Sequence, residues 1–168
     1  MADAVEIRAA SGEDLPFLWE MLYEAIYVPV GEPKPPRAIL RRPALLHYLE
    51  DFGRPGDVGL VAACRNLPVG AVWCRHFSRR DPGYGFVAEE IPELTLAVSP
   101  ICRGRGIGTS LLARLLTHLQ GCGEKGASLS VQPVNPALRL YQRFGFACAG
   151  HVEDAWVMVK YFPTGEAN

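Results

Sequence analysis

A glycine-rich run at residues 103–108 is the segment whose residue types and spacing most directly suggest chemistry. It reads Arg103-Gly104-Arg105-Gly106-Ile107-Gly108. Glycines let a backbone approach a ligand without a Cβ in the way, and the first N–H groups of a helix point outward at the positive end of its dipole. If a helix follows, the run predicts a socket for an anion. An ordinary glycine-rich helix start is the alternative.

The glycine spacing separates this run from two common phosphate-binding loops. A dinucleotide-binding Rossmann turn needs Gly-x-Gly-x-x-Gly, but Thr109 stands where its last glycine would fall. A P-loop needs Gly-Lys-[Ser/Thr], which the run lacks. A phosphate bound here would therefore be held by a turn of another kind.

The elements that must position this run can be read from hydrophobic periodicity. Val5 and Ile7 alternate with polar residues, which predicts an opening strand. A helix with Ser11 as its N-cap follows and ends near Tyr27, because apolar residues recur every three or four positions. The prolines of segment 29–36 predict a loop, and a second short helix is expected at 39–49.

The second half of the chain alternates strands with two helices. The pair Asn135-Pro136 predicts the N-cap and first residue of a helix that runs through Phe144 and ends at Gly145. Pro92 is expected to interrupt a long strand with a bulge or an unpaired edge. The remaining predictions are strands at 59–64 and 69–77 joined as a hairpin, a strand at 86–98, a helix at 106–120, a strand at 128–132 and a closing hairpin of 146–149 with 156–162.

The bulk composition predicts one packed, soluble domain. The chain has 168 residues, of which 49% are hydrophobic and 21% charged, and it shows no biased tract. The 17 basic residues nearly balance the 18 acidic ones and leave a net charge of -1, so nucleic acid is not an expected partner. The acidic start and the lack of a long apolar run argue against a secretory signal and a membrane span. The cytoplasm is therefore the expected location.

The cysteines and histidines do not form a recognisable metal or disulfide pattern. The 5 cysteines contain no Cys-x-x-Cys pair, and their odd number in apolar segments predicts reduced, buried thiols. Cys74 and His76 would share one face of a strand, but further ligands at suitable spacing are lacking. We therefore expect no metal site.

Two segments resemble the motifs of the GNAT superfamily of N-acetyltransferases. The run Leu-Ala-Val-Ser-Pro-Ile-Cys-Arg-Gly-Arg-Gly-Ile-Gly at 96–108 is similar to motif A, whose signature [Gln/Arg]-x-x-Gly-x-[Gly/Ala] is met by Arg103, Gly106 and Gly108. Residues 135–146 resemble motif B in the form Asn-Pro-Ala-x-x-Leu-Tyr-x-x-x-Gly-Phe. The order of the predicted elements also resembles the family fold from Val5 to about Phe162, which leaves 163–168 as a C-terminal tail.

The resemblance implies an α+β fold with a central, mostly antiparallel and splayed sheet flanked by helices, in a single domain over residues 5–162. It implies acetyl-CoA as the acyl donor, with the pantetheine arm along the strand that ends at Val98 and the pyrophosphate at the glycine-rich turn. No metal is implied. The implied coenzyme-binding residues are Leu96, Ala97, Val98, Arg103, Gly104, Arg105, Gly106, Ile107, Gly108, Thr109, Asn135 and Tyr141.

The implied reaction is direct attack of a neutral amine on a thioester, so one proton must leave the amine and another must reach the departing thiolate. Glu93 resembles the glutamate that some members use as a base, directly or through water. The alternative is a solvated acid beside Glu89 and Glu90. Tyr141 matches the motif-B tyrosine that often meets the CoA sulfur, which suggests an acid for the thiolate, and core packing is its alternative. Asn135 is at least an N-cap, and by resemblance it also binds the pantetheine arm.

The acceptor can be predicted only as a class. The resemblance implies an acceptor site built from segment 27–37 and from the loop near Trp156, and the acids at 89, 90 and 93 suggest a cationic amine. The expected function is N-acetylation of a primary amine on a small molecule or a peptide. A CoA-binding regulatory module without turnover is the alternative, and a homodimer is left open.

Overall fold

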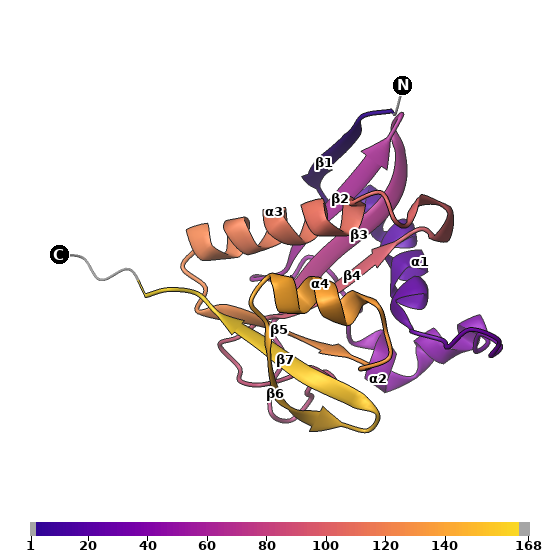
Figure 1. Ribbon diagram of the computed structural model, residues 1–168. Helices are drawn as coiled ribbons and strands as arrows, with labels where there is room; N and C mark the ends of the chain where they lie inside the picture. The colour runs from indigo at the N-terminus through magenta and orange to yellow at the C-terminus, as the bar shows by residue number, and fades with distance from the viewer. Residues whose placement is uncertain (1–2, 165–168) are drawn as a thin grey trace. The chain divides into compact units, whose positions relative to one another are not determined.

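One mixed sheet forms the centre of the fold in the computed structural model, which describes residues 3–164 (Figure 1). Within that range seven strands follow the order β1-β2-β3-β4-β5-β7-β6. All pairs with a recorded register are antiparallel except that of β4 with β5, which is parallel. The strands are β1 Val5–Ala9, β2 Val58–Cys64, β3 Leu67–Arg75, β4 Glu93–Val98, β5 Gly126–Val131, β6 Ala147–Val152 and β7 Ala155–Tyr161. The predicted α+β fold with a mostly antiparallel sheet is confirmed.

The chain divides into two compact units, and β4 contributes to both. The first unit comprises Met1–Arg75 and Thr95–Leu115, and the second comprises His76–Leu94 and Leu116–Asn168. The single domain over 5–162 stays a prediction. Of the predicted tail at 163–168, residues 165–168 lie outside the described part of the chain.

The first unit packs helices on the β1–β3 meander. Antiparallel pairing places Val5 opposite Cys64, and β2 joins β3 through a tight turn in which Arg65 and Asn66 both have positive φ. α1 (Leu15–Ala25) follows a 3₁₀ turn, η1 (Gly12–Asp14), and buries Leu18 and Leu22. The unit also contains the short helices η2 (Arg37–Arg41), α2 (Pro43–Leu46) and η3 (Pro100–Cys102), and the first part of α3 (Ile107–Gly121).

A buried ion pair ties the connection before β2 to β3. Arg75 and Asp57 meet at 2.8 Å, and each side chain is only 3% exposed. Arg75 also donates to the backbone carbonyls of His47 and Glu50, so its guanidinium is satisfied where water is excluded. This network stabilises the end of the segment that the sequence predicted to form one helix at 39–49. The structure has two short helices there, because Pro43 begins a new one.

The second unit is built on β5, β7 and β6. β5 pairs with β7 from Gly126 opposite Tyr161 onward, and β6 and β7 form the predicted closing hairpin. α4 (Ala137–Arg143) ends at Gly145, whose φ of +91° confirms the predicted left-handed terminator.

Two sequence predictions differ from the structure. The strand expected at 86–98 begins only at Glu93, because turns closed by Phe86 and Ile91 occupy the stretch before Pro92. The cysteines are all free, but only Cys74 is buried, and Cys122 and Cys148 are exposed.

Candidate active site

The glycine-rich turn has the conformation that the sequence suggested. Gly104 and Gly106 have φ values of +77° and +80°, in the region that side chains other than glycine rarely adopt. A Cβ built on either glycine would have no heavy atom within 4 Å. These glycines are therefore required by backbone geometry, and the space above the turn is open.

The turn leads directly into the N-terminus of α3, as predicted. The Ser110 N–H donates to the Gly106 carbonyl at 3.1 Å, which closes the first turn of the helix. The N–H groups of Ile107, Gly108 and Thr109 precede that bond, so they have no acceptor within the helix. Together with the positive end of the helix dipole they give the turn an affinity for anions.

Close packing of β3 against the end of β4 and the first turns of α3 fixes where α3 starts. A Cβ on Gly70 of β3 would lie 3.2 Å from the Ala97 carbonyl oxygen, 3.2 Å from Leu111 Cδ1 and 3.4 Å from Ile107 Cγ2. Only glycine leaves this space without strain, and Ile107 and Leu111 are buried. The first turns of α3 are therefore packed tightly on β3, beside the end of β4.

Arg103 ties the turn to two other elements of the first unit. Its Nε donates to the Val98 carbonyl at 3.0 Å, and its Nη2 lies 3.2 Å from Glu24 Oε2 on α1. The side chain remains 52% exposed. Sequence reasoning missed Glu24, because the two residues stand 79 positions apart and form no local pattern.

The predicted pantetheine strand belongs to the same unit as the turn. Leu96 and Val98 are half-buried on one face of β4, whereas Ala97 faces the other side and is buried. The Ser99 N–H donates to the Val69 carbonyl at 2.8 Å, which holds the end of β4 against β3. Six predicted coenzyme-binding positions, 103–106 and 108–109, are at least partly accessible beyond that point.

Glu93 is a buried carboxylate at the start of β4. It is 3% exposed, and its Oε1 accepts the backbone N–H of Gly85 at 2.9 Å. Gly85 itself lies on the backbone of β5, since a Cβ there would clash with the Leu129 carbonyl carbon. Glu93 is therefore not the solvated surface acid of the alternative interpretation, although Glu89 and Glu90 are exposed.

Ser128 lies opposite Glu93 in the parallel pairing of β4 with β5. Its hydroxyl is buried and has no hydrogen-bond partner within the described residues. A buried hydroxyl without a partner is costly, so this position is suited to a bound water or a ligand atom. The sequence did not single out Ser128, because a serine that alternates with apolar residues in a strand gives no local sign that its hydroxyl is buried.

Asn135 and Tyr141 lie at opposite ends of α4. The Asn135 Oδ1 accepts the Ala137 N–H at 2.9 Å, so its side chain does satisfy the first N–H of the helix, but the helix begins one residue later than predicted, with Pro136 at the N-cap position and Ala137 as the first residue. Tyr141 is 7% exposed and packs edge-on against Phe146 with ring centroids 6.0 Å apart. Burial raises the pKa of the Tyr141 phenol, which keeps it protonated and able to donate a hydrogen bond.

The predicted site residues thus fall into two sets, each within one unit. The turn and residues 96–98 lie in the first unit, and Glu93, Asn135 and Tyr141 lie in the second. Between residues 3 and 164 no three His, Cys, Asp or Glu side chains are grouped as metal ligands would be. In the same range no helix combines the length and hydropathy that crossing a membrane requires.

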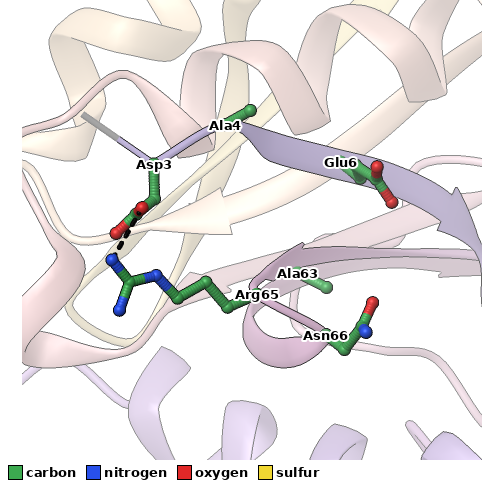
Figure 2. A pocket seen from close by; sticks show the side chains of 6 residues that line it. All are labelled: Asp3, Ala4, Glu6, Ala63, Arg65 and Asn66. Carbon is green, nitrogen blue, oxygen red and sulfur yellow. Dashed lines mark ion pairs between the residues drawn. The ribbon is translucent and has the colours of Figure 1, made fainter. Parts of the chain in front are cut away.

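A separate surface hollow of about 220 Å³ lies beside the turn between β2 and β3 (Figure 2). Arg65 and Asp3 form an ion pair across it at 2.9 Å. None of the predicted site residues line it. It is lined by Asp3, Ala4, Glu6, Ala63, Arg65 and Asn66.

Comparison with known proteins identifies the family. The model of the acetyltransferase (GNAT) family matches residues 18–146. The chain therefore belongs to this family, as the two motifs suggested.

Two proteins named as acetyltransferases are similar to this chain in sequence. The chain is 36% identical over 92 residues to mycothiol acetyltransferase of Brachybacterium faecium, covering 54% of this chain and 26% of that protein. It is 29% identical over 135 residues to L-2,4-diaminobutyric acid acetyltransferase of Nocardia farcinica, covering 65% of this chain and 69% of that protein. The chain thus spans about a quarter of the first relative.

Solved structures share the fold. An N-acetyltransferase of Thermoplasma acidophilum in complex with coenzyme A superposes with a TM-score of 0.69 at 20% identity, covering 95% of this chain and 99% of that one. A putative acetyltransferase of Salmonella typhimurium with acetyl-CoA gives 0.71 at 20% identity, covering 98% of both.

Proposed function

We propose that this chain is an acyl-CoA-dependent N-acetyltransferase that moves an acetyl group from acetyl-CoA to a primary amine of a small molecule or a peptide. The observation that carries this proposal is the open turn at Gly104 and Gly106, set on the N-terminus of α3. Backbone N–H groups under open space suit the pyrophosphate of a coenzyme. Family membership supports the same reaction class.

The residues predicted to bind the coenzyme are suited to holding acetyl-CoA. Bound acetyl-CoA would supply a thioester as the electrophile. Residues 103–109 would hold its pyrophosphate, the half-buried face of β4 at Leu96 and Val98 would lie along its pantetheine arm, and the Asn135 amide would donate to the arm while its oxygen caps α4. Each of these roles uses groups that the fold leaves accessible.

Two side chains handle protons in the proposal. Glu93 takes the proton of the amine, directly or through a water. Its buried position at the start of β4, the strand proposed to lie along the pantetheine arm, supports this role. Tyr141 donates to the departing thiolate. Burial raises the pKa of Tyr141, so the phenol keeps its proton until the thiolate forms.

The proposed class of acceptor rests on surface charge and on the name of one relative. The exposed acids Glu89 and Glu90 favour a cationic amine, and the name of one relative suggests L-2,4-diaminobutyrate as the first amine to assay. We also propose a cytoplasmic location, since an odd set of free cysteines suits a reducing compartment. A homodimer stays a prediction.

The test is release of CoA thiol from acetyl-CoA in the presence of a panel of amines. The exposed thiols of Cys122 and Cys148 react with thiol reagents, so each assay needs a blank without amine and must pass several turnovers. Amine-dependent release with an acetylated product of the expected mass supports the enzyme. Binding of CoA without turnover on any amine favours a regulatory module instead.

A further inference from the structure

Glu24 stands where local helix energetics disfavour an acid. It lies in the last turn of α1, near the negative end of the helix dipole, and no basic residue of that turn compensates it. Its side chain is only 13% exposed. A residue that breaks a local rule in this way is usually held by a tertiary requirement.

Two cations from distant segments share this carboxylate. Lys34 Nζ lies 2.8 Å from Glu24 Oε2, and Arg103 Nη2 lies 3.2 Å from the same oxygen. Arg103 begins the glycine-rich turn, whereas Lys34 belongs to the proline-rich segment after α1. One oxygen atom therefore joins the turn to that segment within the first unit.

The segment at 34–37 is held on α1 by further contacts. The Tyr23 hydroxyl donates to the Pro35 carbonyl at 2.7 Å. Lys34 and Arg37 both lie over the Tyr23 ring, 5.1 Å and 4.7 Å from its centroid, and Arg37 pairs with Glu20 at 2.6 Å. The hold on this segment thus depends on Tyr23 and on two acids of α1.

The two ion pairs of Glu24 differ in strength. The contact with Lys34 is short, whereas the contact with Arg103 is longer than usual for a charge-assisted bond, and Arg103 is 52% exposed. A diphosphate on the turn competes with Glu24 for the Arg103 guanidinium. If Arg103 turns to the diphosphate, Glu24 forms an ion pair with Lys34 alone.

We propose that Glu24 is a positioning residue that couples the glycine-rich turn to segment 34–37: binding of CoA at the turn strengthens the ion pair that fixes segment 34–37 on α1. The proposal rests on the proposed function in one respect, that CoA binds at the turn. It implies that Glu24 weakens CoA binding, because its charge opposes that of the diphosphate.

Calorimetric titration with CoA tests the first half of the proposal. Glu24→Gln should lower the Kd of CoA about two- to fivefold, the range expected for one partly exposed ion pair. Lys34→Met should raise the Kd of CoA, because Glu24 then pairs with Arg103 alone. Lys34→Met should have no such effect when it is combined with Glu24→Gln. The matched control is Glu20→Gln, which removes an equal charge from the same helix and should leave the Kd unchanged.

Trypsin cleavage after Arg37 tests the second half. CoA should slow the appearance of the peptide that ends at Arg37 in the wild-type chain, and should not do so in Glu24→Gln. A residue needed only for folding would weaken CoA binding and speed cleavage together, so tighter CoA binding with faster cleavage is diagnostic.

Two outcomes would overturn the inference. If the Kd of CoA for Glu24→Gln equals the wild-type Kd, or if Glu20→Gln changes the Kd by the same factor as Glu24→Gln, the coupling is contradicted. The proposed function is unaffected by either result. Absence of CoA binding by the wild-type chain would remove the proposed function and the coupling with it.

Discussion

Gly106 and Gly123 offer a matched test of the turn at the scale of single residues. Both have positive φ, +80° and +83°, and a Cβ on either would have open space around it. Aspartate at either position carries the same backbone strain, about 1–2 kcal/mol. Only Gly106→Asp also places a negative charge where the pyrophosphate is proposed to lie.

Gly106→Asp should therefore weaken CoA binding by about 100-fold, because juxtaposed like charges cost several kcal/mol. Calorimetry measures the Kd, and thermal denaturation checks that the two variants are equally stable. Equal CoA affinity in Gly106→Asp and Gly123→Asp would show that the diphosphate does not bind at this turn.

Tyr141→Phe isolates the phenolic hydroxyl, because the ring and its contact with Phe146 are kept. General acids contribute about 10²- to 10⁴-fold, so the rate of acetyl transfer should fall within that range while CoA affinity stays unchanged. Since burial raises the pKa of Tyr141, the wild-type rate should not decline through loss of this proton as the pH approaches 9. A Phe variant with the wild-type rate at every pH would make Tyr141 a packing residue.

Glu93→Gln separates the charge of Glu93 from its structural role. The glutamine oxygen can still accept the Gly85 N–H, so the contact with the loop is preserved. Turnover should drop near neutral pH and recover at high pH, where the amine loses its proton without help. A pH–rate profile with the wild-type shape would leave Glu93 with the loop contact as its only role.

At the scale of elements, the start of the first helical segment contains a pH-sensitive contact. Arg8 pairs with both oxygens of Asp14, at 2.7 Å and 2.8 Å, and the Ser11 N–H also donates to Asp14. The hydrogen bond with Arg8, and to a lesser degree that with Ser11, lowers the pKa of Asp14 from 3.8 to about 2, against the opposing effect of burial.

Because the folded pKa of Asp14 is lowered, its stabilisation is present above about pH 4 and is lost as the pH falls toward 2. Arg8 is half exposed, so we expect about 1–2 kcal/mol rather than the full value of the shift. Asp14→Asn should lower the free energy of unfolding by that amount at pH 7, measured with urea, and the difference should shrink at pH 3. A difference that is constant with pH would contradict this origin.

The elements that the sequence predicted well are those set by local rules. α3 and α4 follow from the spacing of leucines, from the Asn135 cap and from Gly145, and all of these act within a few residues. The stretch at 86–92 was predicted wrongly, because its β-rich composition outweighed the turns that the structure forms there. Such turns depend on Gly85 packing against β5, which no local pattern encodes.

At the scale of the whole molecule, the site residues also divide into those that local sequence patterns predict and those that they do not. The turn and the motif-B residues could be predicted because each forms a short run with fixed spacing. Glu24 could not, since its partners Lys34 and Arg103 lie 10 and 79 residues away. Ser128 could not either, because burial of both faces of β5 depends on segments that pack from elsewhere.

The most direct test of the proposed function is acetyl transfer by the intact chain. Purified protein is mixed with acetyl-CoA and the amine panel, beginning with L-2,4-diaminobutyrate, and free CoA and acetylated product are measured together. We predict that both form in equal amounts over many turnovers, and that at acetyl-CoA concentrations below the wild-type Kd Gly106→Asp slows both by about 100-fold while Gly123→Asp does not. Product formation that is unaffected by Gly106→Asp, or CoA binding without product from any amine, would contradict the proposed enzyme.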